Sequence, residues 1–166
     1  ARLGSDIPFV LMGGTMIATG RGEILTRLPA MPRTHVVLAK PPVSVSTSWA
    51  YRTYDAEGAA RRPDTARIQQ AIAQQDRKAI ASLLCNVLER VTIKKYAVVE
   101  TYKTMMREHG ALASMMSGSG PTVFALVEER ETAEQIAAVM RRETEADVFV
   151  TQTTETNDFE NTFINL

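Results

Sequence analysis

The sequence has 166 residues, about the length of one domain, and 45% of them are apolar, so a hydrophobic core can form. Its 19 basic residues balance 19 acidic ones, which excludes bulk electrostatic attraction to nucleic acid or to an anionic membrane as the main mode of binding. No apolar run has the length of a membrane span, and a single cysteine, Cys85, excludes an internal disulfide and indicates a reducing compartment such as the cytoplasm.

The first third of the chain predicts a short helix, two strands and a second helix. Asp6 stands just before Ile-Pro, which suits the N-cap of a helix. Runs rich in β-branched residues predict strands over 15–18 and 35–39. Ser46 or Thr47 would then cap the next helix, which carries several aromatic side chains.

Four further helices are predicted from capping residues and from apolar side chains spaced three or four positions apart. We expect them to begin at or just after Asp64, Asp76, Thr92 and Thr132. The apolar stripe of the second continues to Leu88, and Gly110 should end the third. The fourth should begin with a capping box formed by Thr132 and Gln135.

The remaining strands are predicted over 122–127 and 148–150, with further candidates over 12–16 and 111–116. Several connections are too short for parallel crossovers. We therefore expect an α+β fold in which an antiparallel sheet has helices packed on one face. Prolines near residue 32 suggest a division into residues 1–32, a strip of a preceding domain, and residues 33–166, the main domain.

The general catalytic motifs are absent from the sequence, including the Walker phosphate loop, the dinucleotide-binding glycine motif, the nucleophile elbow and the zinc-protease helix. His35 and His109 lie far apart along the chain, and only one cysteine is present. We therefore expect neither a zinc site nor a Cys–His nucleophile, and we assign no metal ligand.

Three segments could carry chemistry, and each also has a purely structural interpretation. The glycine-rich loop 117–121 could direct backbone N–H groups at an anion, although these residues by themselves favour a tight turn. Asp6 could orient or deprotonate a substrate hydroxyl, although an N-cap is the simpler reading. Tyr51 and its aromatic neighbours could hold a ligand, although such residues usually pack in a core.

Several short motifs occur in a definite order along nearly the whole chain. They are Gly4-Ser5-Asp6-Ile7-Pro8-Phe9, Gly13-Gly14-Thr15, Gly20-Arg21-Gly22-Glu23, Lys40-Pro41, Val45-Ser46-Thr47, Asn86-Val87-Leu88-Glu89 and Ser117-Gly118-Ser119-Gly120-Pro121-Thr122-Val123-Phe124. Together they resemble the GHMP kinase superfamily, and the Gly-Arg-Gly-Glu and Val-Ser-Thr segments most resemble its kinases for a cytidine diphosphate alcohol.

The resemblance implies transfer of the ATP γ-phosphate, with Mg²⁺, to the 2-hydroxyl of 4-diphosphocytidyl-2-C-methyl-D-erythritol in non-mevalonate isoprenoid synthesis. It implies that Asp6 is the catalytic aspartate, that Thr47 and Tyr51 bind substrate, and that Tyr51 lies against the cytosine ring. The residues implied to support the ATP phosphates are Gly118, Ser119 and Gly120.

Members of the family also carry an early lysine and a Gly/Ser-rich phosphate loop, and neither occurs in these 166 residues. We therefore expect the chain to be the C-terminal part of a kinase, inactive alone, whose ATP and Mg²⁺ bind together with the other half. Two alternatives stay open. One is a non-catalytic module that forms a homodimer through an apolar surface near residues 9–16. The other is a GHMP kinase for a different alcohol.

Overall fold

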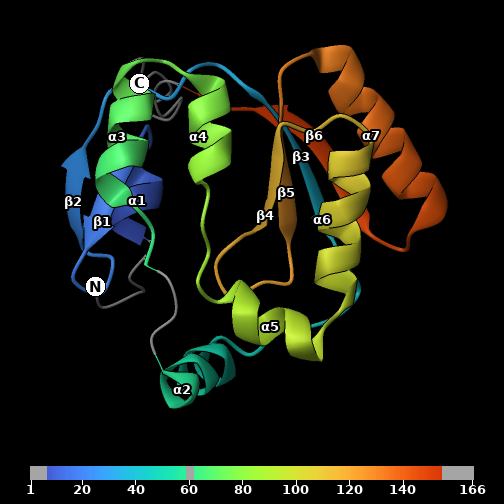
Figure 1. Ribbon diagram of the computed structural model, residues 1–166, viewed down its shortest axis with the longest axis horizontal. Coiled ribbons are helices and arrows are strands. Elements are labelled where there is room, and N and C mark those ends of the chain that lie inside the picture. The colour runs from blue at the N-terminus through green and yellow to red at the C-terminus, as the bar shows by residue number, and fades with distance from the viewer. Residues whose placement is uncertain (1–6, 59–61, 155–166) are drawn as a thin grey trace, which may run out of the picture.

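The structure is a computed structural model that describes residues 7–58 and 62–154 (Figure 1). The helices are α1 (Ile7–Met12), α2 (Thr47–Glu57), α3 (Thr65–Ala73), α4 (Arg77–Leu83), α5 (Glu89–Lys95), α6 (Val98–Glu108) and α7 (Arg130–Glu143). The strands are β1 (Met16–Thr19), β2 (Ile24–Arg27), β3 (His35–Lys40), β4 (Ala113–Met116), β5 (Val123–Val127) and β6 (Asp147–Gln152). None of the helices in these two ranges is long and apolar enough to cross a membrane.

The main sheet has four antiparallel strands in the order β4-β5-β3-β6, and β1 and β2 form a separate hairpin. Alternate residues of the two central strands are completely buried on one face, as the period of two in a strand requires. These residues are Val37, Ala39, Val123, Ala125 and Val127. The predicted α+β class with an antiparallel sheet is confirmed.

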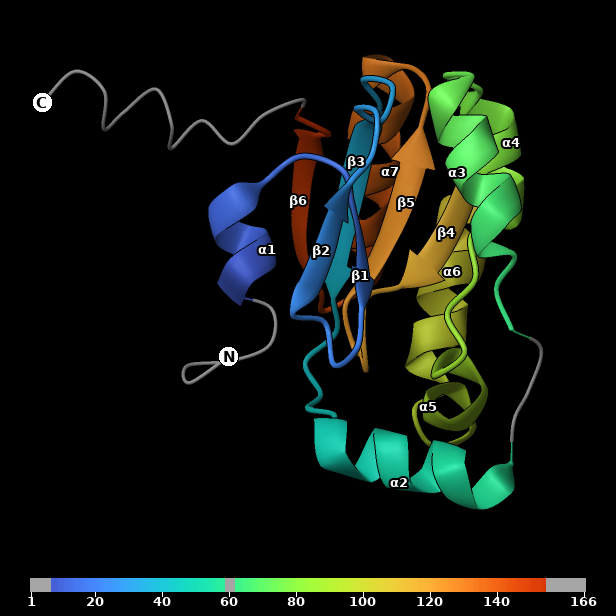
Figure 2. The same ribbon diagram turned by 90° about the vertical axis from the view of Figure 1, so that its left-hand side faces the viewer.

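Helices α6 and α7 cover this buried face, and Figures 1 and 2 show both of them on the same side of the sheet. Each presents one apolar stripe to the strands, with Val99 and Met106 from α6 and Ile136 and Met140 from α7 at most 1% exposed. Burial of such side chains contributes about 1.5–3 kcal/mol each, so this layer supplies most of the stabilising apolar contact.

The other face of the sheet is covered in part by α3 and α4, an addition to the arrangement expected from the sequence. Ile72 of α3 and Ile80 of α4 form a second buried cluster with Leu126 of β5, and Val36 and Phe124 pack against its edge. Figure 1 shows the β1–β2 hairpin and α1 on this same side. The sheet is therefore enclosed between two layers of unequal extent.

Two helix predictions in the middle of the chain are wrong in their extent. Helix α4 ends at Leu83 instead of continuing to Leu88, because Leu84 adopts an extended conformation (φ −56°, ψ 130°). The apolar stripe divides here, since Ile80 packs in the cluster on one face of the sheet and Leu88 in the core on the other. The helix predicted to begin near Thr92 is two helices, α5 and α6, which are separated where Tyr96 leaves the helical region (φ −126°, ψ 72°).

The other differences concern helix and strand ends. Helix α7 begins at Arg130, and its N-cap residue Glu129 makes no side-chain bond, so the predicted capping box is wrong. The candidate strand over 12–16 is wrong, because Met12 ends α1, Met16 begins β1, and Gly13 and Gly14 between them have positive φ (57° and 74°). Strand β2 was not predicted, since it is largely exposed and lacks a clear alternation. The strand candidate over 111–116 is confirmed as β4.

Helix α1 exposes its apolar side chains, as expected for the segment around residues 9–16. Phe9 and Met12 are each 43% exposed. The homodimer expected from this surface stays a prediction. The division between residues 1–32 and 33–166 also stays a prediction.

Candidate functional site

The loop of residues 117–120 joins β4 to β5 by a tight turn. The Ser117 N–H donates to the carbonyl of Thr122 at 2.8 Å, and the Gly120 N–H donates to the carbonyl of Ser117 at 2.9 Å. Gly118 and Gly120 both have positive φ (55° and 87°), a backbone conformation that glycine adopts without strain. Within the described part of the chain, the N–H groups of Gly118 and Ser119 donate no hydrogen bond. The turn therefore leaves two adjacent backbone donors for a ligand.

Helix α2 begins next to this loop. Its N-cap is Ser46, whose hydroxyl accepts the Trp49 N–H at 3.3 Å, in agreement with the sequence prediction that Ser46 or Thr47 caps the helix. The Thr47 and Ser119 hydroxyl oxygens lie 3.0 Å apart and share a hydrogen bond. Two residues predicted separately, and 72 positions apart in sequence, are thus in direct contact.

Contacts with α5 hold α2 across the end of the sheet, as Figure 2 shows. The Trp49 ring meets the Tyr96 ring edge-on at 6.0 Å, and the Lys95 ammonium lies 4.5 Å from the centre of the Trp49 ring. Lys94 pairs with Glu57 at 2.8 Å, and the hydrogen bond it donates is the main reason that the pKa of Glu57 is lowered. Trp49 is therefore a packing residue of this junction.

Tyr51, two residues beyond Trp49 and therefore on the opposite side of α2, has a different environment. It is 55% exposed and borders a cavity of about 430 Å³. The cavity is lined by Tyr51, Pro63, Cys85, Asn86, Val87, Leu88, Met115, Met116, Ser117, Gly118 and Phe124. The resemblance implied that Tyr51 lies against the cytosine ring and that Gly118 supports the ATP phosphates, and both residues line this cavity. A mainly apolar wall beside a phenol ring suits a flat ligand group, and the glycine loop supplies polar groups at the rim.

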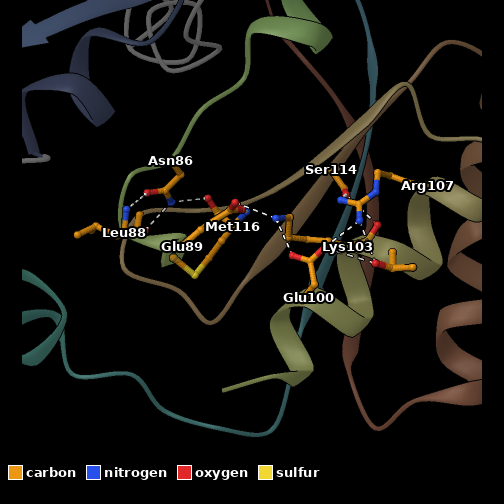
Figure 3. A network of polar contacts seen from close by, with 10 residues as sticks. Asn86, Leu88, Glu89, Glu100, Lys103, Arg107, Ser114 and Met116 are labelled. Atoms are coloured by element: carbon orange, nitrogen blue, oxygen red, sulfur yellow. Dashed lines mark hydrogen bonds and ion pairs between the residues drawn. The ribbon is translucent and has the colours of Figure 1, made fainter. Parts of the chain in front are cut away.

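A polar network lies behind the loop and joins α5 and α6 to the end of β4 (Figure 3). The Asn86 side-chain amide donates to the carbonyls of Met116 and Gly118, at 2.8 Å each, and its oxygen accepts the Leu88 N–H at 2.9 Å. Glu89 accepts the Met116 N–H at 2.7 Å. The Asn-Val-Leu-Glu segment was recognised in the sequence, but these contacts were not, because side-chain bonds to distant backbone leave no periodic signal.

The network continues away from the loop through a buried cation. The Lys103 ammonium, whose side chain is 9% exposed, lies 2.8 Å from Glu89 and 3.0 Å from Glu100. Glu100 also pairs with Arg107 at 2.8 Å. Partial burial works to raise the pKa of Glu100, but the hydrogen bonds from Arg107 and Lys103 outweigh it and hold that pKa below its ordinary value. Glu100 is therefore held in its ionised form at neutral pH.

The predicted catalytic aspartate, Asp6, lies outside the described residues, and α1 begins at the residue that follows it. Among residues 7–58 and 62–154 there is no cluster of three or more His, Cys, Asp or Glu side chains that could hold a metal ion. The site described by the structure thus consists of the start of α2, the glycine loop and the cavity between them.

Comparison with known proteins places this architecture in a family. Residues 68–146 match the family model described as GHMP kinases C terminal. This chain contains a GHMP kinase C-terminal domain. A 4-diphosphocytidyl-2-C-methyl-D-erythritol kinase from Geobacillus kaustophilus is 52% identical over 128 residues, which cover 77% of this chain and 44% of that protein. The kinase of the same name from Gloeobacter violaceus is 45% identical, covering 92% of this chain and 52% of that protein.

Solved structures agree with the GHMP kinase assignment. A crystal structure of 4-(cytidine 5'-diphospho)-2C-methyl-D-erythritol kinase superposes with a TM-score of 0.75 at 28% identity, covering 92% of this chain and 55% of that one. A homoserine kinase from Cytophaga hutchinsonii has a TM-score of 0.65 at 22% identity, which shows the shared fold alone. The chain spans about half the length of the curated relatives that it matches.

Proposed function

We propose that this chain forms part of an ATP-dependent kinase that phosphorylates the 2-hydroxyl of 4-diphosphocytidyl-2-C-methyl-D-erythritol. The observation that carries the proposal is the meeting of α2 with the glycine loop, where Thr47 contacts Ser119 and Tyr51 shares a cavity with Gly118. The substrate is inferred from relatives that are 43–52% identical to this chain and are named 4-diphosphocytidyl-2-C-methyl-D-erythritol kinase. The single cysteine agrees with a cytoplasmic location, which belongs to the same proposal.

The described residues have roles that suit such a substrate. The exposed face of Tyr51 stacks on the cytosine ring, a contact worth about 1–3 kcal/mol in comparable sites. The Gly118 and Ser119 N–H groups bind phosphate oxygens, and the Thr47 hydroxyl, already oriented by Ser119, binds a polar group of the substrate. ATP with Mg²⁺ supplies the phosphoryl group. Since the transition state of phosphoryl transfer is loose, orientation of the two substrates provides most of the rate enhancement.

Asp6 completes the proposal as the carboxylate that orients or deprotonates the 2-hydroxyl. Asp6 is the residue that precedes α1 along the chain. Gly120 has a different role from Gly118 and Ser119. Its N–H already donates to the carbonyl of Ser117, and this hydrogen bond closes the turn. We expect Gly118 and Ser119 to contact phosphate and Gly120 to act through them.

The test is an ATP-dependent phosphorylation assay with the protein encoded by the complete reading frame that contains this sequence. We expect phosphorylation of the cytidylyl alcohol and no phosphorylation of homoserine or mevalonate. Asp6→Asn should remove nearly all activity, and these 166 residues alone should show none above background. Full activity of Asp6→Asn would refute the role of Asp6. Preference for another alcohol would refute the proposed substrate.

Tyr51 provides a test of substrate binding. Tyr51→Ala should raise KM for the cytidylyl alcohol by about tenfold, as expected for loss of one stacked base, with a smaller change in kcat. Tyr51→Phe keeps the ring and is the matched control, so its KM should stay close to that of the unaltered protein. An equal rise in KM for both variants would mean that the hydroxyl, and not the ring, is recognised.

A further inference from the structure

The backbone immediately before the glycine loop is held by two side chains from one short segment. Met116, the last residue of β4, has its N–H bonded to Glu89 at 2.7 Å and its carbonyl bonded to Asn86 at 2.8 Å. The same Asn86 amide also bonds the carbonyl of Gly118 at 2.8 Å. The N–H and the carbonyl of Met116, and the carbonyl of Gly118, are therefore held by side chains more than 25 positions away in sequence.

The spacing of Asn86 and Glu89 explains why both reach the same strand end. The Asn86 oxygen accepts the Leu88 N–H, and the Asn86 carbonyl accepts the Glu89 N–H at 3.2 Å, so the segment turns into α5 with both side chains on one side. Figure 3 shows both of them directed at Met116. Asn86 uses both amide hydrogens and its oxygen, which leaves its side chain a single orientation.

The buried ammonium of Lys103 fixes the second of these side chains. One Glu89 oxygen accepts from Met116 and the other from Lys103, so neither can rotate without breaking a charged hydrogen bond. Lys103 is itself bound from β4, because its carbonyl accepts the Ser114 hydroxyl at 2.8 Å. In this partly dehydrated setting, displacement of Glu89 would leave a buried charge with one partner fewer.

We propose that Asn86 and Glu89 are positioning residues that set the backbone conformation of loop 117–120, and that Lys103 locks Glu89 for this purpose. The loop contacts helices α2 and α5 through Ser119. Its hydroxyl shares a hydrogen bond with Thr47 of α2, and its carbonyl accepts the hydroxyl of Thr92 in α5 at 3.3 Å. The effect on catalysis rests on the function proposed above, whereas the effect on the loop backbone does not. Asn86 and Glu89 act through the loop and need not touch a reacting atom.

Glu89 and Glu100 form a matched pair for the test, because both bind Lys103 but only Glu89 binds the backbone of Met116, the residue before the loop. Amide hydrogen exchange of the peptide that contains residues 116–120 is measured in the protein from the complete reading frame. We expect exchange there to rise at least about tenfold in both alanine variants, because Glu89→Ala loses one hydrogen bond to this backbone and Asn86→Ala loses two, and loss of about 1.4 kcal/mol corresponds to a tenfold change. In Glu100→Ala we expect less than about a twofold change, because Glu100 makes no hydrogen bond to residues 116–120.

Kinetics provide the second readout. Glu89→Ala and Asn86→Ala should each lower kcat/KM for ATP about tenfold or more. The reason is that the Gly118 and Ser119 N–H groups, once displaced, lose their hydrogen bonds to the phosphate in the transition state. Glu100→Ala should change kcat/KM by less than about twofold. Glu89→Gln keeps an oxygen that can accept the Met116 N–H, so it should recover most of the exchange protection lost in Glu89→Ala. If an alanine variant fails to fold, Glu89→Met and Glu100→Met provide the same comparison, because methionine has a similar length but no oxygen that can accept the Met116 N–H.

Equal loop exchange in Glu89→Ala and Glu100→Ala would overturn the proposal, because the network would then contribute stability without positioning the loop. Unchanged exchange in Asn86→Ala would overturn it as well. Faster loop exchange in Glu89→Ala and Asn86→Ala, in a protein without kinase activity on the cytidylyl alcohol, would support the positioning role and refute the proposed function. The two failures are therefore distinguishable.

Discussion

The core beneath α6 and α7 and the polar region around the glycine loop are stabilised in different ways. In the core, side chains such as Met106 and Ile136 need only suitable volume and one apolar face. Around the loop, single atoms of Asn86 and Glu89 meet particular backbone groups. Met116 belongs to both regions, since its side chain is completely buried while its N–H and carbonyl are held by the network. Substitutions should therefore have graded effects in the core and specific effects at the loop.

The largest effect is expected in the core. Met106→Ala should lower the free energy of unfolding by about 2–5 kcal/mol, because it leaves a cavity against the sheet. Met106→Leu nearly conserves volume and should cost less than about 1.5 kcal/mol. Chemical denaturation measures both. Equal losses for the two variants would show that this region depends on exact shape, as the loop does, and would remove the contrast between the regions.

Alanine substitutions at the two glycines of the loop should distinguish the cost of backbone strain from the cost of a steric clash. A Cβ at Gly120 would lie 2.6 Å from the Met116 sulfur at φ +87°, so Gly120→Ala combines strain with a clash against the core and should cost about 2–3 kcal/mol. A Cβ at Gly118 would meet nothing within 4 Å at φ +55°, so Gly118→Ala should cost only about 1 kcal/mol. Thermal unfolding compares them. A Gly118→Ala cost equal to that of Gly120→Ala would locate the whole effect in the backbone.

The same contrast explains how much could be predicted from the sequence. Runs of β-branched and aromatic residues identified the sheet strands 35–39 and 122–127, and apolar spacing identified the buried stripe of α7, because core contacts repeat along an element. Periodicity failed between Ile80 and Leu88, where one stripe serves two clusters on opposite faces of the sheet. Motif order identified Thr47, Tyr51 and the loop, but only the fold shows that they meet.

The polar framework of the site could not be predicted, because its contacts join residues far apart in sequence. Thr47 meets Ser119 across 72 positions, and Asn86 meets Gly118 across 32. A single asparagine or glutamate carries no signal of its partner, and such residues are common on solvated surfaces. The one available signal was the three-residue spacing of Asn86 and Glu89 at the start of α5, which allows both side chains to bind the same residue, Met116.

A smaller effect is expected at the start of α2. Ser46→Ala removes the hydroxyl that accepts the Trp49 N–H and should cost about 1 kcal/mol of stability. The start of α2 also carries Thr47, so exchange of the loop peptide around Ser119 should rise modestly. Ser46→Asp keeps a capping acceptor and is the matched control. A stability loss shared by Ser46→Asp would mean that the Ser46 hydroxyl contact with Ser48, and not the cap, is what matters.

The smallest effect concerns pH, and it tests the outer part of the network. The pKa of Glu100 is lower in the folded protein than in the unfolded chain, so the unfolded chain binds more protons between these two pKa values. The stability that this group contributes is therefore present above the unfolded-state pKa and is lost as pH falls through the folded-state pKa. The gain should be below about 1 kcal/mol, since the side chain is 41% exposed and water screens its ion pairs. The stability difference between the unaltered protein and Glu100→Gln, measured by denaturation, should shrink as pH falls from about 7 to about 3. A difference that stays constant over this range would mean that the charge of Glu100 contributes nothing, and that only its hydrogen bonds hold Lys103 and Arg107.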